Sequence, residues 1–477
     1  MPPAKKRASD VDGKGPTKRR KKQKGDESDG SDIEGAAGAD FDNEPDEATT
    51  EDSAFRLESP MLSGEVLFCG GTNWDLIGRR VLPKGVKPLG GPNLWGPHRL
   101  AALEGVKIRT VASGCNACHS VAITDEGKVY TWGRNEKGQL GLSDIIRRDM
   151  PTKVELLDSF NIVAASCGKN HTLFLTDRGQ VLACGDNKMG QLGIGNQTQH
   201  VPCPMRVKYK GPPIRRIACG GEFSMISDIN GNLYSFGCPE FGQLGHNTDG
   251  KYFVTSNKLE YKCEMTPRKV NVFIEKTRDG HVVPMTDVDV REIACGLNHA
   301  LALDSKKRIF SWGFGGYGRL GHSEPKDELV PRLLKFFDGP NRGATQLQCG
   351  SSFSLAVHEA GALYFWGQSK PTGEATMYPK LVQDLAGWKI RSVGACYRSI
   401  MTCADESVVS WGPSPTYGEL GYGENKMKSS TIAQEVKPLE GVHVHSVACG
   451  YGHSMMIARC DTEEEKKRLE KLPVFSP

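Results

Sequence analysis

The feature that most constrains the fold of this chain is an internal repeat, which runs from Gly64 almost to the end. The clearest copies pair an aromatic residue with glycine and continue into a glycine-rich loop, as in WGRNEKGQLG from Trp132 and FGCPEFGQLG from Phe236. The first glycines of the copies are Gly70, Gly133, Gly185, Gly237, Gly313, Gly367 and Gly412. Such a repeat indicates structural units that bury their apolar faces by stacking on one another.

A second signature precedes most of these glycines. It reads CGKNH in the copy that ends at His171 and CGGEF in the copy that ends at Phe223, and histidine also ends the copies at His119, His299 and His453. From this last position to the following glycine the distance is always 14 residues. A constant spacing predicts a hairpin of fixed length, with a tight turn between two apolar strands.

Two further strands complete each unit. One begins near a proline, as in PTKV from Pro151, and we expect it to be the outer strand because proline lacks the N–H that an inner strand needs. The other is the apolar run before the Cys-Gly pair, such as IRRIA from Ile214. Four antiparallel strands in each of seven units predict an all-β protein, a seven-bladed β-propeller.

The two ends of the repeat predict how the ring closes. The last hairpin, HSMMIA from His453, lacks its second strand, whereas EVLFCGG stands without a hairpin partner at Glu65. We therefore expect the seventh blade to take its innermost strands from both termini, with Val66 paired to the segment around Ile457. The propeller should span residues 61–460. The acid-to-base spacing in TEEEKKRLEKL favours a short helix in a C-terminal tail, residues 461–477.

Residues 1–60 form a separate segment with two blocks of opposite charge. Ten Lys or Arg occur up to Lys24, and twelve Asp or Glu without a single Lys or Arg occur from Asp26 to Asp52. Such blocks bury little apolar surface, so we expect a disordered tail. The basic clusters fit a bipartite nuclear import signal or a phosphate-binding arm, and a purely solvated tail is the alternative. The basic residues are Lys5, Lys6, Arg7, Lys18, Arg19, Arg20, Lys21, Lys22 and Lys24, and the phosphorylation candidates are Ser9, Ser28 and Ser31.

Two short motifs look like cofactor sites, but the repeat explains both. CNACH, which ends at His119, matches the C-x-x-C-H pattern of haem attachment, yet the other repeat histidines lack these cysteines. GFGGYG from Gly313 is followed by RLG, as in its sister copies, and not by the helix of a dinucleotide site. We expect no cofactor, no metal and no catalytic constellation. The structural repeat positions are His119, His171, His299, His453, Gly133, Gly185, Gly237, Gly313 and Gly412, and we expect the histidine rings to bond to neighbouring loops.

One repeat carries a long insertion. Successive first glycines lie 52 residues apart in the regular units, but Gly237 and Gly313 lie 76 apart, and the additional residues fall between Asp249 and Asp287. A long insertion on a rigid ring is a candidate partner site, and the alternative is an extended outer strand with a solvated loop. The basic residues that would contact a partner are Arg268, Lys269, Lys276 and Arg278.

The composition and the N-terminal residues indicate the class of protein and its compartment. No run reaches the roughly 18 to 20 apolar residues of a membrane helix, and MPPAKKRASD at the N-terminus lacks an apolar signal region. Fifteen cysteines without an export signal are typical of free thiols in a reducing compartment. We therefore expect a soluble, intracellular monomer without a membrane span.

The unit of Cys-Gly, a histidine three residues on, then W-G and G-Q-L-G resembles the repeat of the regulator of chromosome condensation family, over residues 64 to about 460. Members of this family are seven-bladed propellers. Stretches such as TNWDLIGR from Thr72 and NLWGPHR from Asn93 are similar to one particular member. That resemblance implies regulation of small GTPases of the Rac, Ral and Arf groups by direct binding. It also implies a nuclear and nucleolar location in interphase, and roles at mitotic chromosomes, centromeres, the spindle and the midzone.

The founding member of the family exchanges nucleotide on the Ran GTPase with a β-wedge from its third blade. We find no matching insertion between Cys184 and Gly220, so we transfer no exchange residue. The leading interpretation is a non-enzymatic interaction platform for small GTPases. A guanine nucleotide exchange factor is one alternative, and a chromatin or nucleic-acid binding protein that acts through the basic tail is another. Beyond residue 60 there are 50 Lys and Arg against 42 Asp and Glu, a mild excess that suits acidic tubulin or nucleosome surfaces.

Overall fold

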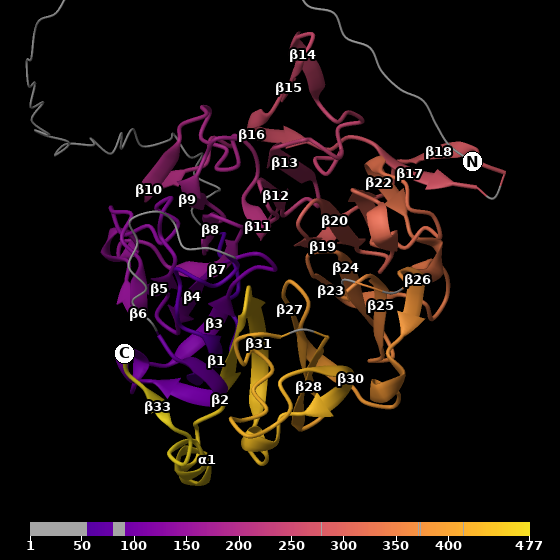
Figure 1. Ribbon diagram of the computed structural model, residues 1–477. Helices are drawn as coiled ribbons and strands as arrows, with labels where there is room; N and C mark the ends of the chain where they lie inside the picture. Colours follow the sequence, from indigo (N-terminus) through magenta and orange to yellow (C-terminus); the bar gives the residue numbers. More distant parts are fainter. Residues whose placement is uncertain (1–54, 80–90, 278, 371, 373, 414) are drawn as a thin grey trace, which may run out of the picture. The chain divides into compact units, whose positions relative to one another are not determined.

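The computed structural model describes residues 55–477, except residues 80–90, 278, 371, 373 and 414. Within this part of the chain, the strands form seven four-stranded antiparallel blades arranged in a ring (Figure 1). Two of the blades are extended by additional strands. The fold class predicted from the repeat is therefore confirmed. The basic clusters and the three serine candidates of the N-terminal segment lie outside the described residues, so the predictions about them stay predictions.

Six blades are built from consecutive segments of the chain. The first consists of β3 (Ile108–Ala112), β4 (His119–Thr124), β5 (Val129–Gly133) and β6 (Arg148–Lys153). The second consists of β7 (Ile162–Cys167), β8 (His171–Thr176), β9 (Val181–Asp186) and β10 (His200–Arg206). The third consists of β11 (Ile214–Cys219), β12 (Phe223–Asp228), β13 (Leu233–Gly237) and β16 (Glu264–Lys269). The fourth consists of β19 (Val290–Cys295), β20 (His299–Asp304), β21 (Ile309–Gly313) and β22 (Glu328–Leu333). The fifth consists of β23 (Ala344–Cys349), β24 (Phe353–His358), β25 (Leu363–Gly367) and β26 (Thr376–Leu381). The sixth consists of β27 (Ile390–Ala395), β28 (Ile400–Ala404), β29 (Ser407–Gly412) and β30 (Ser430–Glu435).

Each blade is ordered from the centre of the ring outward. The first strands of neighbouring blades contact one another around the centre, and the proline-containing strands are the fourth from the centre, with further strands outside them in two blades (Figure 1). The outer position predicted from the prolines is thus confirmed. Short 3-10 turns follow five of the fourth strands, at Ala101–Leu103, Glu155–Leu157, Lys335–Phe337, Gln383–Leu385 and Lys437–Leu439, and another lies between β21 and β22, at Gly316–Gly318.

The seventh blade joins the two ends of the described chain. It contains β31 (Val444–Gly450), β32 (His453–Ala458), β1 (Glu65–Gly71) and β2 (Asn93–Leu100), in that order. Val66 pairs with Ile457, as predicted. The expectation that the innermost strands come from both termini is wrong, because β31 and β32 form one hairpin and both come from the C-terminal end. The N-terminal side supplies the two outer strands.

The C-terminal segment continues beyond this closing blade. Helix α1 (Glu463–Leu469) begins with a capping box, in which Thr462 and Glu465 each accept a hydrogen bond from the other's backbone N–H. Strand β33 (Val474–Phe475) then pairs in parallel with β2 and adds a fifth strand to the blade. No helix within the described ranges is long and apolar enough to span a membrane.

The glycine of the Cys-Gly signature makes room for the ring that ends the signature. A Cβ on Gly168 would lie 2.1 Å from Cε1 of His171, and a Cβ on Gly220 would lie 1.9 Å from Cε1 of Phe223. The cysteine before the glycine faces the core between blades, where Cys167 is 1% exposed. The signature therefore encodes a packed turn at the inner end of each hairpin.

The inserted residues form two hairpins, one between β13 and β16 of the third blade and one between the third and fourth blades. The first consists of β14 (Lys251–Thr255) and β15 (Lys258–Tyr261) and projects away from the ring (Figure 1). The second consists of β17 (Phe273–Lys276) and β18 (Val282–Met285). Strand β17 also pairs in parallel with β22, so the second hairpin extends the fourth blade to six strands. The insertion is thus more ordered than an outer strand with a solvated loop.

Candidate interaction site

The four repeat histidines link neighbouring blades. Each ring is fully buried, and its Nε2 lies within hydrogen-bond distance of a hydroxyl on the next blade, rather than of a loop as we expected. The Nε2-to-hydroxyl distances are 2.8 Å for His119 and Thr172, 2.9 Å for His171 and Ser224, 3.0 Å for His299 and Ser354, and 2.8 Å for His453 and Ser120. These side chains therefore hold the ring together.

The hydroxyl partner also determines which nitrogen of the ring carries the proton. The hydroxyl of Thr172 donates a hydrogen bond to the carbonyl of Gln139 at 2.7 Å, so its oxygen accepts a hydrogen bond from the N–H at Nε2 of His119. The ring is then neutral, and burial lowers the pKa of His119 to about 3. Where Phe223 replaces histidine, the next blade presents Ala300 in place of a hydroxyl, and the two pack in one apolar cluster.

Residues of both motifs that look like cofactor sites form contacts within the propeller. Cys115 and Cys118 are buried, and burial raises the pKa of Cys115 to about 12. His119, the histidine of the haem-like motif, is bonded to Thr172. Within the described ranges, no three His, Cys, Asp or Glu side chains lie close enough together to hold a metal ion. In GFGGYG the backbone makes a short 3-10 turn, and Arg319 stacks on Phe314 at 4.6 Å.

The projecting hairpin β14–β15 exposes an unusual set of apolar side chains. Phe253 is 72% exposed and lies directly opposite Leu259, which is 39% exposed, so both occupy the same face. On the other face, the hydroxyl of Tyr252 donates to the carboxylate of Glu260 at 3.2 Å. Neighbouring Val254 is also half exposed. Exposed aromatic side chains on a protruding element are typical of protein–protein anchors.

The base of this hairpin is tied to the ring. The hydroxyl of Tyr261 donates to the carboxylate of Glu240 at 3.0 Å, and the N–H of Lys262 donates to the carbonyl of Gly250 at 2.8 Å. The exposed face is therefore held in a defined direction. The sequence signal for the hairpin was a run of strand-forming residues, KYFVT and KLEY, on either side of the turn residues Ser256 and Asn257. The sequence prediction missed it because it rested on the length of the insertion and on its basic residues.

Of the four basic residues that the sequence indicated as a partner site, the structure describes three, Arg268, Lys269 and Lys276. Arg268 lies on β16 and forms an ion pair with Glu264 at 2.6 Å. Lys276 lies on β17 and bonds to the buried carboxylate of Glu328 at 2.6 Å. Lys269 is exposed, and Arg278 lies outside the described residues. The charges of Arg268 and Lys276 are therefore already compensated, and the role of these residues in partner binding stays a prediction.

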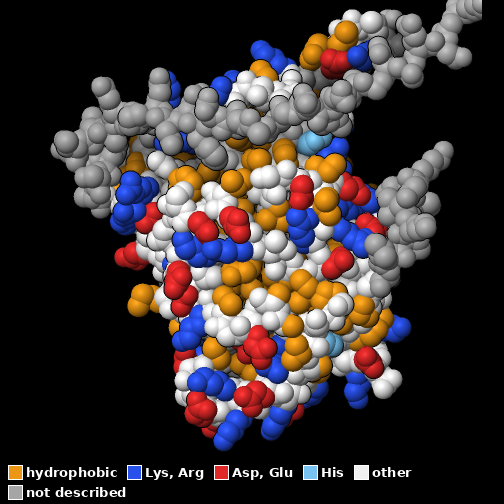
Figure 2. Space-filling model, turned by 90° about the vertical axis from the view of Figure 1, so that its left-hand side faces the viewer, with side chains coloured by type: hydrophobic (Ala, Val, Ile, Leu, Met, Phe, Trp, Pro, Cys, Tyr) orange, Lys and Arg blue, Asp and Glu red, His pale blue; other side chains and the backbone are white. Residues whose placement is uncertain are grey.

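Charge on the side of the ring shown in Figure 2 is mixed. Lys and Arg side chains alternate with Asp and Glu side chains over this view, with apolar side chains between them. A surface of mixed sign has no strong field to attract a polyanion. The described residues in this view therefore do not indicate a nucleic-acid groove.

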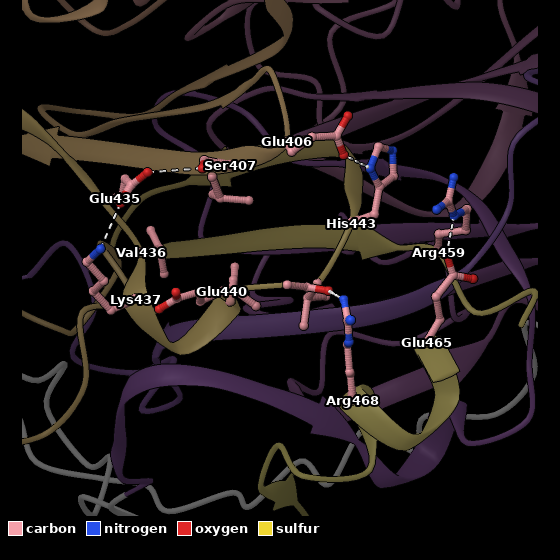
Figure 3. Close-up of a pocket in the computed structure, with 14 residues that line it drawn as sticks. Glu406, Ser407, Glu435, Val436, Lys437, Glu440, His443, Arg459, Glu465 and Arg468 are labelled. Atoms are coloured by element: carbon pink, nitrogen blue, oxygen red, sulfur yellow. Dashed lines mark hydrogen bonds and ion pairs between the residues drawn. The ribbon is translucent and has the colours of Figure 1, made fainter. Parts of the chain in front are cut away.

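A pocket of about 400 Å³ lies between the outer part of the sixth blade and α1 (Figure 3). Its basic side chains already have partners. His443 is 2.7 Å from Glu406, Lys437 is 2.8 Å from Glu435, and Arg459 is paired with Glu465. Arg468, which also lines the pocket, is paired with Glu464 and donates to the carbonyl of Gly441. Among the described residues that line the pocket, no cation is left unpaired for an anionic ligand, and we assign the pocket no function.

Comparison with known proteins places this architecture in a family. The sequence matches the family described as RCC1-like domain over residues 65–456. It is 58% identical to Protein RCC2 of Mus musculus over 425 residues, which cover 88% of this chain and 82% of that protein. It is also 58% identical to Protein RCC2 of Homo sapiens, over 88% of this chain and 81% of that protein.

A solved structure shows the same fold at much lower identity. Prp20p of Saccharomyces cerevisiae, described with its binding properties to Gsp1p and histones, is 19% identical and has a TM-score of 0.65. The match covers 87% of this chain and 96% of Prp20p. At this identity the likeness supports the architecture of the ring.

Proposed function

Because this chain belongs to the RCC1-like domain family, we propose that it is a non-enzymatic interaction platform that binds and regulates small GTPases. The observation that carries the proposal is the hairpin β14–β15, which is hydrogen-bonded at its base and presents Phe253 and Leu259 to solvent. An apolar pair on a fixed support loses little conformational entropy when a partner covers it. The Rac, Ral and Arf groups are the proposed partners.

We expect substitution of the hairpin tip to weaken GTPase binding. In Phe253→Ala, affinity of the full chain for Rac, Ral or Arf should fall about 30-fold or more, because a central aromatic anchor contributes about 2 kcal/mol or more. Isothermal titration calorimetry against each GTPase measures the change. Tyr378→Ala is the matched control, since Tyr378 is 56% exposed on β26 of the fifth blade. Equal affinities for the two variants would contradict the placement of the site.

Charge reversal tests the earlier placement on the basic residues. In Arg268→Glu combined with Lys269→Glu, binding should decrease mainly through a slower association rate, because exposed charges at the rim of an interface steer encounter. Stopped-flow measurements of the association rate distinguish this effect from the loss of affinity expected for Phe253→Ala. Unchanged binding would show that these two residues are not part of the binding site, without contradicting the proposal that the protein binds a GTPase.

Nucleotide exchange is the second candidate function. The sequence showed no insertion between Cys184 and Gly220, but the projecting hairpin belongs to the third blade when blades are counted from the first continuous one, β3–β6. The founding member of the family is expected to use its third blade for exchange. Exchange requires tighter binding to the nucleotide-free GTPase than to the loaded form. Release of a fluorescent guanine nucleotide from Rac, Ral or Arf, with and without micromolar protein, decides between exchange and binding alone.

The proposed cellular sites are the nucleus and nucleolus in interphase, and chromosomes, centromeres, the spindle and the midzone in mitosis. Protein RCC2 carries a name that links it to chromosome condensation, and Prp20p is described as binding histones. These properties belong to the relatives, and they motivate a test in this chain. The basic clusters from Lys5 to Lys24 are the proposed contacts with chromatin or nucleic acid.

Deletion of residues 1–24 is expected to flatten the salt dependence of DNA binding. Each phosphate contact contributes about −0.9 to the slope of log K against log salt concentration on duplex DNA. Fluorescence anisotropy with a labelled duplex at several salt concentrations gives the slope for the full chain and for the deletion variant. An unchanged slope would move the nucleic-acid contact onto the propeller.

A further inference from the structure

Two cysteines face each other where the projecting hairpin joins the third blade. Gly237 at the end of β13 pairs with Glu264 at the start of β16. Because these strands are antiparallel, the next residues outward, Cys238 and Cys263, lie opposite each other. Opposite residues in such a pair have Cβ atoms about 4.5–5.5 Å apart, and a disulfide needs Cβ atoms about 3.5–4.5 Å apart. A small movement therefore brings the thiols into bonding distance.

The surroundings hold the two thiols in place. Cys238 is 3% exposed, and its N–H donates to the carbonyl of Glu222 at 2.9 Å. Cys263 is half-buried, and its sulfur lies 3.8 Å from the sulfur of Met189, on the neighbouring blade. Solvent therefore reaches Cys263 first, whereas Cys238 lies behind it at the edge of the core.

The chemistry of the pair is asymmetric. The side-chain interaction between the two thiols lowers the pKa of Cys263 and raises the pKa of Cys238, and burial raises the pKa of Cys238 further. Burial raises the pKa of other cysteines, such as Cys167 and Cys349. Cys263 therefore has the greater thiolate character, and the thiolate is the form that reacts with peroxides.

We propose that Cys238 and Cys263 form a reversible disulfide in the presence of a hydroperoxide, and that this bond locks the base of hairpin β14–β15. The thiolate of Cys263 attacks the peroxide, breaks its O–O bond and becomes a sulfenic acid, while the peroxide leaves as an alcohol or, from hydrogen peroxide, as water. The alkoxide or hydroxide that leaves in this step takes up the proton that Cys263 gave to solvent when it ionised. Cys238 then attacks the sulfenic sulfur, forms the S–S bond and releases water. The peroxide is reduced by two electrons, and the two thiols are oxidised.

Mass spectrometry of the full chain tests the bond. After hydrogen peroxide, alkylation and digestion, we expect a linked peptide that contains Cys238 and Cys263 and that disappears after reduction with dithiothreitol. Cys263→Ser removes it, whereas Cys460→Ser, a substitution of another half-buried cysteine, leaves it intact. In Cys238→Ser, oxidation should stop at a sulfenic acid on Cys263 that dimedone labels. Absence of the linked peptide while Cys460 is oxidised would overturn the proposal.

Limited proteolysis tests whether the bond locks the hairpin. Trypsin should cleave after Lys251 and Lys258 about tenfold more slowly in the oxidised protein, because a cross-link at the base suppresses local opening. Equal rates before and after oxidation would overturn the locking. An effect on GTPase affinity rests on the proposed function. If neither the reduced nor the oxidised protein binds a GTPase, the proposed function is wrong. The linked peptide and the cleavage rates still test whether the disulfide forms and locks the hairpin.

Discussion

Below about pH 6, the free energy of unfolding is expected to fall by about 5 kcal/mol for each pH unit. The cause is the set of buried histidines between blades. Burial lowers the pKa of His171 to about 3 and that of His453 to about 4, and it holds the pKa of His299 well below the ordinary value of 6.5. With His119, four rings stay neutral in the folded protein while the unfolded chain binds four protons.

The sign follows from the order of the two pKa values. Above pH 6.5 neither state binds these protons, so their contribution to stability is fully present. As the pH falls from 6.5 toward the folded pKa values near 3 and 4, only the unfolded chain is protonated, and stability is lost. Urea titrations at pH 7, 6 and 5 measure the change. A free energy of unfolding that stays constant over this range would contradict the expectation.

A double substitution separates the contribution of one histidine to the pH dependence of stability from the contribution of the carboxylates, which also titrate in acid. His171→Phe with Ser224→Ala copies the natural pair of Phe223 and Ala300 in the next blade interface. On unfolding, the variant takes up protons on three buried histidines instead of four. The slope of the free energy of unfolding against pH should therefore decrease by about a quarter. The same titrations on the double variant check this, and an unchanged dependence would show that His171 binds its proton in the folded protein.

The second large effect is expected at the closing blade. Phe68→Ala should lower the free energy of unfolding by about 3–5 kcal/mol, because it leaves a cavity at the strand that joins the two ends of the ring. Phe68 is 1% exposed, stacks on His453 with ring centroids 5.5 Å apart, and contacts the edge of Trp74 at 6.2 Å. Chemical denaturation at neutral pH measures the loss.

An exposed phenylalanine provides the control for this substitution. Phe253→Ala removes the same side-chain atoms from a position that is 72% exposed, so its effect should stay within about 0.5 kcal/mol. Hydrogen exchange adds a local measurement, since loss of packing at Phe68 should accelerate exchange of the amides in β1 and β32 together. A loss below about 1 kcal/mol in Phe68→Ala would mean that the blade relaxes around the missing ring.

The ring architecture could be predicted because its determinants recur along the chain. A hairpin of constant length between His171 and Gly185 depends on neighbouring residues, and its repetition makes it visible without any tertiary information. The pairing of Val66 with Ile457 followed from one missing strand at each end. The order of strands within that blade did not follow, because the pattern cannot tell which pair forms the inner hairpin.

The candidate site depended on contacts that no local pattern contains. The sequence drew attention to Arg268 and Lys276, but ion pairs with Glu264 and Glu328 compensate their charges. The exposure of Phe253 depends on the direction in which the hairpin leaves the ring. That direction is set by bonds at its base, such as the one between Tyr261 and Glu240.

Periodicity in the amino-acid sequence was sufficient to establish the number of blades, the outer strands and the pairing of the chain ends, since each of these is a property of the repeat. The partners of the repeat residues were established only by folding. His119 contacts Thr172, 53 positions further along the chain, in the next blade, and Gly237 pairs with Glu264 across an inserted hairpin. The physical reason is that a repeat specifies local strand geometry, whereas contacts between units depend on how rigid sheets pack around a common axis.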